Sequence, residues 1–384
     1  MKPYQLSIPT KIYFGRNIWK EAIHSLESLL QGNILLVTTG RSLIRMGYVK
    51  ELKDELAICK LVKNVTVFEP ISANPKLSEV QEGICLGKKE KVDIVVGFGG
   101  GSAMDAAKAI AAGIGTDRTI EELFYDGKEP EATTLPVIAI PTTAGTGSEL
   151  SKAAILTDDK KKIKNGIRGE ALYPKVAIVD SVFTESVPYT VTMETGFDVL
   201  AHAIESYLSL AASPYTQMLS EYTIQIVGIY LPRLAVSLND TEAREKMSFV
   251  SMLMGVNLGN ASTCLPHRLQ YPLGAHTDSS HGAGLAALFP AWVEQEVKYV
   301  PDKIKKVITL LKGQKTDKTE YLAETIRQFI KSLGLPTSLQ ELGVEEAQLY
   351  QMAAEVSGNI KNDPLAQEEG IILRLYKKAW QEER

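Results

Sequence analysis

The sequence predicts two domains: an N-terminal α/β domain with a doubly wound, mostly parallel sheet, and an all-helical C-terminal domain. The chain has 384 residues, which exceeds the length at which a single hydrophobic core usually keeps growing. Its first half alternates short β-branched runs with amphipathic runs, the pattern of a parallel sheet covered on both faces. After Pro188, long segments of helical periodicity follow one another. Turn residues and a proline in SVFTESVPYT place the boundary between domains 1–184 and 185–384.

The individual elements follow from periodicity and from β-branched content. Candidate strands cover residues 11–14, 33–38, 64–68, 93–96, 135–140, 153–157 and 176–179. Candidate helices in the first half include residues 19–30 and 77–89. In the second half, helices are expected at about residues 193–211, 215–238 and 242–260.

Composition excludes several classes of protein. The chain is 45% hydrophobic and 23% charged, as in ordinary globular proteins. Its net charge is -4 and its lysines are dispersed except at 160–164, so no nucleic-acid partner is predicted. No apolar run is long enough to span a membrane, and the N-terminus lacks a signal-peptide core, so a cytoplasmic protein is expected. The three cysteines, Cys59, Cys85 and Cys264, are far apart, which argues against disulfides and predicts small buried residues.

Two loops have the composition of a phosphate site. In VDIVVGFGGGSAMDAAK, residues 92–108, a buried strand leads into four glycines within five residues and then into an Ala-rich helix. Glycines allow close backbone approach, and amides at a helix start face an anion. The run departs from the strict dinucleotide fingerprint at Ser102, and a tight strand-to-helix turn is the alternative. Because AIPTTAGTGSELS, residues 139–151, also follows a buried strand, a pyrophosphate site shared by both loops is favoured.

A third loop bears on the choice of dinucleotide. After the strand at 33–38 the chain reads Thr39, Gly40, Arg41, Ser42, with no acid to bind a ribose hydroxyl. Arg41 and Ser42 can instead hold a 2'-phosphate, which slightly favours NADP(H) over NAD(H). The alternative is a helix N-cap at Ser42 beside a solvated arginine.

Histidines mark a candidate metal site. Residues 264–282 hold three of the five histidines, and imidazole is the commonest side-chain metal ligand. His202 lies four residues after Asp198, so a helix places both side chains on one face. Asp198, His202, His267 and His281 are therefore the candidate ligands. His276 is interpreted as a pocket or surface residue, and His24 as structural.

Four motifs in order carry a family resemblance: GGGSAMDAAK, PTTAGTGSE, TGFDVLAHAIESY and HRLQYPLGAHTDSSHG. Over nearly its whole length the chain resembles the iron-containing (group III) alcohol dehydrogenases. The resemblance implies that Asp198, His202, His267 and His281 bind the metal. It also implies a cofactor site formed by Gly99, Gly100, Ser102, Asp105, Thr142, Thr143 and Ser148. Three imidazoles and a carboxylate suit Fe(II) or Zn(II), and the resemblance alone points to Fe(II).

One position departs from the family pattern. Many members have a second histidine four residues after the third ligand, just before Pro-Leu-Gly, where it is assigned to nicotinamide contact or proton relay. Tyr271 occupies this position here. A phenol, with a pKa of about 10, is a poor proton shuttle unless a neighbouring cation lowers that pKa. Proton relay, pocket shaping and a different subgroup all remain open for Tyr271.

The expected activity is hydride transfer between a nicotinamide cofactor and a small alcohol, aldehyde or ketone, with the metal polarising the substrate oxygen. Two alternatives share the fold and the metal site: a hydroxyacid-oxoacid transhydrogenase and a lyase like the dehydroquinate synthases. A catalytically silent metal-binding or nucleotide-binding module is a third. A homodimer is a common form in the family.

Overall fold

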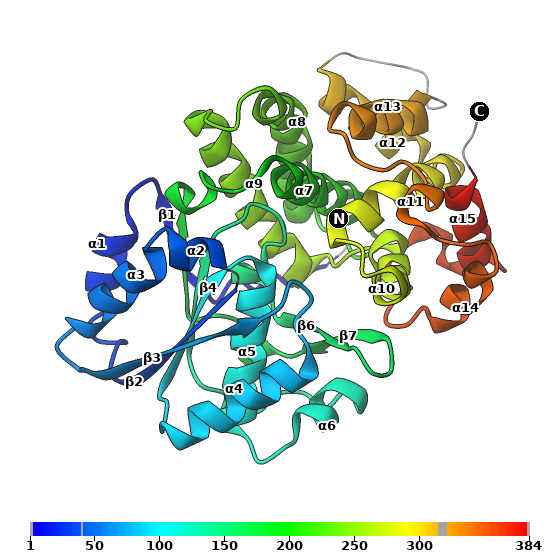
Figure 1. The fold of residues 1–384 in the computed structure, drawn as a ribbon. Coiled ribbons are helices and arrows are strands. Elements are labelled where there is room, and N and C mark those ends of the chain that lie inside the picture. The colour runs from blue at the N-terminus through cyan, green and yellow to red at the C-terminus, as the bar shows by residue number, and fades with distance from the viewer. Residues whose placement is uncertain (1–2, 40, 314–320, 382–384) are drawn as a thin grey trace. The chain divides into compact units, whose positions relative to one another are not determined.

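The computed structural model describes residues 3–39, 41–313 and 321–381. The chain forms two compact units (Figure 1). The α/β unit comprises Ile8–Thr143 and Gly147–Ser186, and the helical unit comprises Met1–Ser7, Ala144–Thr146 and Val187–Arg384. The predicted fold class, an N-terminal α/β part with a parallel sheet followed by a helical part, is confirmed.

A six-stranded sheet forms the centre of the α/β unit. Its order is β1-β8-β5-β4-β2-β3, and every pair of neighbours is parallel. The strands are β1 Lys11–Gly15, β2 Gly32–Thr39, β3 Val62–Ile71, β4 Ile94–Gly99, β5 Val137–Pro141 and β8 Val176–Asp180. Six of the seven predicted strands lie in this sheet. β4, β5 and β8 are buried at every residue, as expected for strands covered on both faces.

The strand predicted at 153–157 lies outside the parallel sheet, which corrects the prediction. It is β6 Ala153–Asp158, and it pairs antiparallel with β7 Ile163–Arg168, a strand that periodicity did not reveal. A short connection suffices for an antiparallel pair, and Lys162 within it adopts φ 56°. Buried and half-buried residues alternate along β6, as in a strand covered on one face only.

Helices cover both faces of the sheet, and side chains of β2 divide between them. Ile34 and Leu36 join the core beneath α1 and α3, while Leu35 and Val37 join the core beneath α4, α5 and α6 (Figure 1). The helices are α1 Trp19–His24, α2 Arg41–Arg45, α3 Tyr48–Ala57, α4 Leu77–Lys89, α5 Gly101–Gly115 and α6 Ile120–Tyr125. Short 3-10 helices are η1 Ser148–Leu150, η2 Glu170–Leu172 and η3 Ser181–Thr184.

The first helix is shorter than the predicted span 19–30. It ends at His24, and Ser25 Oγ donates a hydrogen bond to the Ala22 carbonyl at 2.8 Å. A serine that bonds to nearby backbone competes with continued helix. Leu26 and Leu30 remain buried in the following turns, so the apolar periodicity that predicted a helix persists beyond its end.

The helical unit contains α7 Tyr189–Leu208, α8 Pro214–Val236, α9 Thr241–Asn260, α10 Leu265–Thr277, α11 His281–Glu296, α12 Pro301–Lys312, α13 Tyr321–Ser332, α14 Gln348–Glu355 and α15 Ile371–Trp380. Two 3-10 helices, η4 Gln340–Leu342 and η5 Pro364–Gln367, lie between the last helices. Capping explains where α8 begins: Ser213 accepts a hydrogen bond from the Thr216 amide, and Pro214 occupies the first turn. Phe197, Phe289 and Trp292 are among the large side chains of the core.

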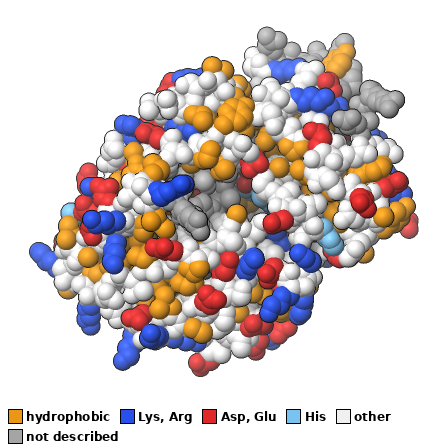
Figure 2. Space-filling model, in the orientation of Figure 1, with side chains coloured by type: hydrophobic (Ala, Val, Ile, Leu, Met, Phe, Trp, Pro, Cys, Tyr) orange, Lys and Arg blue, Asp and Glu red, His pale blue; other side chains and the backbone are white. Residues whose placement is uncertain are grey.

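Surface properties agree with the composition in part. On the face drawn in Figure 2, acidic and basic side chains are interspersed. Among the described helices, none has the length and hydropathy needed to cross a bilayer. All three cysteines are free; Cys59 and Cys264 are buried as expected. Cys85 is exposed, which corrects the prediction, because it lies on the outward side of the amphipathic helix α4.

Candidate active site

Three helices bring the four candidate metal ligands together; we call Asp198, His202, His267 and His281 the histidine cluster. Asp198 and His202 are one turn apart on α7, His267 is in the first turn of α10, and His281 begins α11. Their nitrogens surround one carboxylate oxygen. The distances to Asp198 Oδ1 are 3.4 Å from His267 Nε2, 3.5 Å from His202 Nδ1 and 3.7 Å from His281 Nε2.

Close helix packing places His281 beside the others. A Cβ on the next residue, Gly282, would lie 2.4 Å from the carbonyl oxygen of Glu194, one turn before Asp198 on α7. Only glycine therefore allows α11 to start this close to α7. The ring of His202 stacks on that of His267, with centroids 4.4 Å apart. The His281 side chain is 28% exposed, whereas the Asp198 side chain is almost fully buried, so the cluster is most accessible at His281.

Among the described residues, three buried polar atoms of the cluster make no hydrogen bond. Within the described residues, Asp198 Oδ1, His202 Nδ1 and His267 Nε2 are buried and accept or donate no hydrogen bond. Such atoms are costly unless something else binds them. Asp198, His267 and His281 offer ligand atoms that all lie within 4.8 Å of one another; His202 stands outside this set. A carboxylate with imidazoles suits a divalent transition metal, and the residues therefore fit such an ion.

The electrostatics of the cluster are those of a buried carboxylate among imidazoles. Although burial opposes ionisation, the neighbouring histidines, above all His202, hold the pKa of Asp198 far below its usual range. Burial lowers the pKa of His202 to about 4, so this ring is neutral at pH 7. Burial also disfavours a charged His267, but the carboxylates of Glu205 and Asp198 outweigh it and raise the pKa of His267 to about 10.

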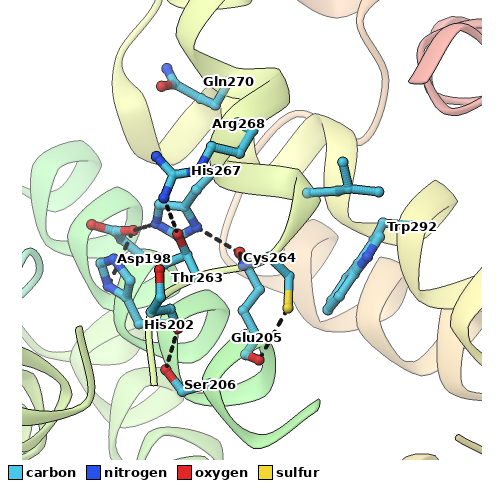
Figure 3. Close-up of polar contacts among 12 residues, drawn as sticks. Asp198, His202, Glu205, Ser206, Thr263, Cys264, His267, Arg268, Gln270 and Trp292 are labelled. Atoms are coloured by element: carbon cyan, nitrogen blue, oxygen red, sulfur yellow. Dashed lines mark hydrogen bonds and ion pairs between the residues drawn. The ribbon is translucent and has the colours of Figure 1, made fainter. Parts of the chain in front are cut away.

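Two residues that the sequence did not single out orient the rings; Figure 3 shows the first, Glu205, beside His267. The Glu205 carboxylate lies 2.6 Å from His267 Nδ1 and accepts a hydrogen bond from the Cys264 amide at 2.8 Å. Gln270 Oε1 lies 2.6 Å from His281 Nδ1. In both rings the Nε2 atom is left to face Asp198. Such contacts at the distal nitrogen typically fix the orientation of metal-binding histidines. Spacing could have revealed Glu205, three residues after His202 on the same face of α7.

Tyr271 lies one turn after His267 and has a cation beside it. Arg268 Nη1 donates a hydrogen bond to the Tyr271 hydroxyl at 3.3 Å, and the guanidinium lies 5.5 Å from the ring centroid.

The two remaining histidines are paired with carboxylates outside the histidine cluster. His276 pairs with Glu355 at 2.6 Å, and His24 pairs with Glu55 on the surface at 2.9 Å.

The predicted cofactor loops lie along one edge of the parallel sheet. β2, β4 and β5 are neighbours, and their carboxyl ends are at Thr39, Gly99 and Pro141. The Thr142 amide donates to the Gly99 carbonyl at 2.9 Å, which joins two of the loops. β3 lies on one side of β2 and β4, the next strand in sequence, lies on the other, so the strand order reverses at β2. Ligands bind open α/β sheets at such a switch point.

The glycine loop leaves room for backbone approach to a ligand. Gly100 caps α5 with no side-chain hydrogen bond to the helix amides. A Cβ on Gly99 would lie 2.7 Å from Ala103 Cβ, so the turn between β4 and α5 tolerates no side chain there. Thr142 is buried, Thr143 lies beside Gly100, and Ser42 is exposed on α2. Arg41 begins α2, and its side chain lies outside the described residues.

Three of the predicted cofactor residues have internal partners. Ser102 bonds to the Ala73 carbonyl, and Ser148 donates to Asp105 at 2.5 Å. Asp105 also accepts from the Ile155 amide at 2.9 Å. Lys108, fully buried and not anticipated from the sequence, donates to Ser148 at 2.7 Å. Burial raises the pKa of Asp105 and lowers that of Lys108. This network braces the loop after β5 against α5.

Known proteins match the chain along its length. Residues 9–181 match the iron-containing alcohol dehydrogenase domain, and residues 192–380 match the C-terminal domain of the Fe-containing alcohol dehydrogenase family. The chain therefore belongs to the iron-containing alcohol dehydrogenase family, as its motifs indicated.

Individual relatives cover almost the whole chain. A 1,3-propanediol dehydrogenase of Citrobacter freundii is 31% identical over 97% of this chain and 98% of its own. The structure of an archaeal halo-thermophilic alcohol dehydrogenase from a Red Sea brine pool has a TM-score of 0.92 at 27% identity, covering 99% of both chains. Sulfoacetaldehyde reductase from Bifidobacterium kashiwanohense, in complex with NAD+, has a TM-score of 0.87 at 28% identity, covering 98% of both. Names among the relatives include NADH-dependent and NADPH-dependent enzymes.

Proposed function

We propose that this protein is a metal-dependent oxidoreductase that transfers hydride between a nicotinamide cofactor and a small alcohol, aldehyde or ketone. The observation that carries the proposal is the histidine cluster: among the described residues, three buried ligand atoms converge on one another and make no hydrogen bond. Residues 1–184 would bind the dinucleotide and residues 185–384 the metal. The family match supports the reaction class.

The metal ligands we propose are Asp198, His202, His267 and His281. A divalent ion bound there supplies a Lewis acid that polarises the substrate oxygen. The carboxylate of Asp198 provides the negative charge of the site, and Glu205 and Gln270 hold the rings of His267 and His281. Iron is favoured by the family, and Zn(II) suits the same donors.

The nucleotide would lie along the carboxyl edge of β2, β4 and β5. Gly99 and Gly100 allow its phosphates to approach the backbone, and the amides that begin α5 favour an anion. The other proposed cofactor residues are Thr39, Arg41, Ser42, Ser102, Asp105, Thr142, Thr143 and Ser148. The internal bonds of Asp105 and Ser148 suit a role in shaping this loop. We propose NADP(H) in preference to NAD(H), because the three residues directly after Thr39 include no acid to bind a ribose hydroxyl.

Tyr271 is proposed to act in catalysis, at the position where many relatives carry a histidine. Its hydroxyl accepts a hydrogen bond from Arg268. The Arg268 guanidinium also lies 5.5 Å from the centroid of the Tyr271 ring, so Arg268 holds this side chain one turn after His267.

An absorbance assay tests the proposal. Protein with Fe(II) or Zn(II) restored should change absorbance at the nicotinamide wavelength with a short aldehyde such as butanal. His267→Ala should lose turnover and metal, and His202→Ala tests the fourth ligand in the same way. His24→Ala, on the surface of the α/β unit, is the matched control. Full turnover by His267→Ala would refute the metal assignment. Tightly retained nucleotide without net turnover would favour a transhydrogenase instead.

A further inference from the structure

Arg268 is a buried cation that has no acidic partner among the residues that the structure describes. It follows His267 on α10 and is only 6% exposed. Nη1 donates to the Tyr271 hydroxyl at 3.3 Å and Nη2 donates to Thr263 Oγ1 at 3.4 Å. Its Nε is buried and makes no hydrogen bond within the described residues. No carboxylate of the described chain is at ion-pair distance from it.

These contacts satisfy the guanidinium poorly. An arginine side chain has five N–H donors, and two hydrogen bonds near the upper limit of length, both to neutral hydroxyls, use a minority of them. A buried charge is costly unless it is paired and hydrogen-bonded. Arg268 therefore carries binding capacity that the described chain does not use.

Arg244 shows how this chain satisfies a buried arginine that serves the fold. It is 3% exposed, and each of its three nitrogens has an acceptor. Nε donates to the Leu238 carbonyl at 3.1 Å, Nη1 to Thr192 Oγ1 at 2.9 Å and Nη2 to the Val187 carbonyl at 3.1 Å. Within the part of the chain that the structure describes, Arg268 lacks the Nε acceptor and the carbonyl partners that Arg244 has.

The position of Arg268 links it to the histidine cluster. Tyr271 is four residues after His267 on α10, so the hydroxyl that Arg268 bonds lies on the helix face that carries His267. Figure 3 shows the Arg268 side chain extending from α10 toward Thr263. The backbone at Gly358 covers another side, since a Cβ there would lie 3.6 Å from Arg268 Cδ. Gly358, at φ +89°, has no side chain, so this segment covers Arg268 with backbone atoms only and brings no negative charge.

We propose that Arg268, together with Tyr271 and Thr263, binds an anionic group of the substrate, so that preferred substrates are short aldehydes or alcohols that also carry a carboxylate or sulfonate. A guanidinium binds such groups through two parallel N–H bonds, and the edge formed by Nε and Nη2 is the least occupied edge of Arg268. The inference rests on the proposed oxidoreductase function and names the charge of its substrate.

Substrate discrimination tests the inference. Metal-restored protein is assayed with 4-oxobutanoate and with butanal, which share a four-carbon chain and differ in the terminal carboxylate. We expect a higher kcat/KM for 4-oxobutanoate. In Arg268→Met the ratio of the two kcat/KM values should fall roughly 10- to 100-fold, the effect of losing a charge-assisted hydrogen-bonded pair. Arg268→Lys keeps the charge but loses the two parallel N–H donors, so its ratio of kcat/KM values should lie between those of wild type and Arg268→Met.

Stability and equilibrium binding give readouts independent of turnover. Arg268→Met should keep or raise the melting temperature, because it removes a buried charge that lacks a partner. Arg244→Met, the matched control, should lower it, because three acceptors lose their donor. Calorimetric titration of the metal-restored proteins with succinate should show binding that Arg268→Met loses.

Each outcome decides the inference. An equal loss of kcat/KM for both aldehydes in Arg268→Met would overturn it, as would a marked drop in melting temperature. A raised KM for the nucleotide with an unchanged aldehyde ratio would assign the anion to the cofactor phosphates and also overturn it. If no aldehyde is reduced but succinate binds wild type and not Arg268→Met, the anion site stands and the proposed oxidoreductase function fails.

Discussion

Glu205→Gln should weaken metal binding because it disturbs the ring that faces Asp198. The Glu205 side chain is fully buried; one oxygen lies 2.6 Å from His267 Nδ1 and the other accepts from the Cys264 amide at 2.8 Å. A glutamine of the same shape has one acceptor oxygen and one NH2 group. The NH2 group of the glutamine must therefore face either the Cys264 amide or the protonated Nδ1 of His267, and two donors then oppose each other. The negative charge that favours the proton on His267 Nδ1 is also lost.

The size of the effect follows from these contacts. A buried donor left without an acceptor costs about 1–3 kcal/mol. Loss of such an outer contact to a metal-binding histidine typically costs 10- to 100-fold in metal affinity, which is about 1.4–2.7 kcal/mol. We therefore expect the dissociation constant for Zn(II) to rise by roughly 10- to 100-fold in Glu205→Gln.

The measurement is a competition titration of metal-free protein with Zn(II) and a chromophoric chelator. Glu296→Gln is the matched control: Glu296 is also a fully buried carboxyl of the helical unit. Burial and the neighbouring Asp363 raise the pKa of Glu296 and so favour its neutral form, which glutamine resembles. The reasoning is refuted if Glu205→Gln binds Zn(II) as tightly as wild type, or if Glu296→Gln weakens it equally.

Two further predictions concern stability. Burial raises the pKa of Glu149 to about 7, above the value of 4.5 of a free side chain, so the folded state holds this proton more tightly than the unfolded state. The free energy of unfolding should thus fall by about 3 kcal/mol between pH 4.5 and 7 through this group. Urea unfolding should therefore show that Glu149→Gln stabilises the protein relative to wild type more at pH 8 than at pH 5. Equal effects of the substitution at both pH values would contradict this. Gly282→Ala should lower the unfolding free energy by about 1–3 kcal/mol, since its Cβ would meet the Glu194 carbonyl oxygen at 2.4 Å. Urea unfolding of Gly282→Ala that matches wild type would contradict the packing argument.

Several features of the fold could be predicted from periodicity. Strands at 33–38 and 176–179 and the helix Leu77–Lys89 agree with the structure, because their apolar residues repeat at the spacing that burial on a sheet or helix requires. The end of α1 and the pairing of β6 were not predictable in this way. A serine side chain ended the helix, and β6 found its partner across a short turn rather than in the main sheet.

The sequence by itself determined the family, the fold class and the candidate ligands, because each motif is a local run of residues with its own spacing. Apart from this ligand set, the sequence did not reveal which side chains meet across the fold. His267 and Glu205 are 62 residues apart in sequence, and Lys108 and Ser148 are 40 apart. Only the tertiary structure brought these partners together and placed Arg268 beside two hydroxyls, with no acid of the described chain at ion-pair distance. Hydrogen bonds and burial depend on which residues are close in space, whereas residue spacing along the chain indicates only contacts within one helix or strand.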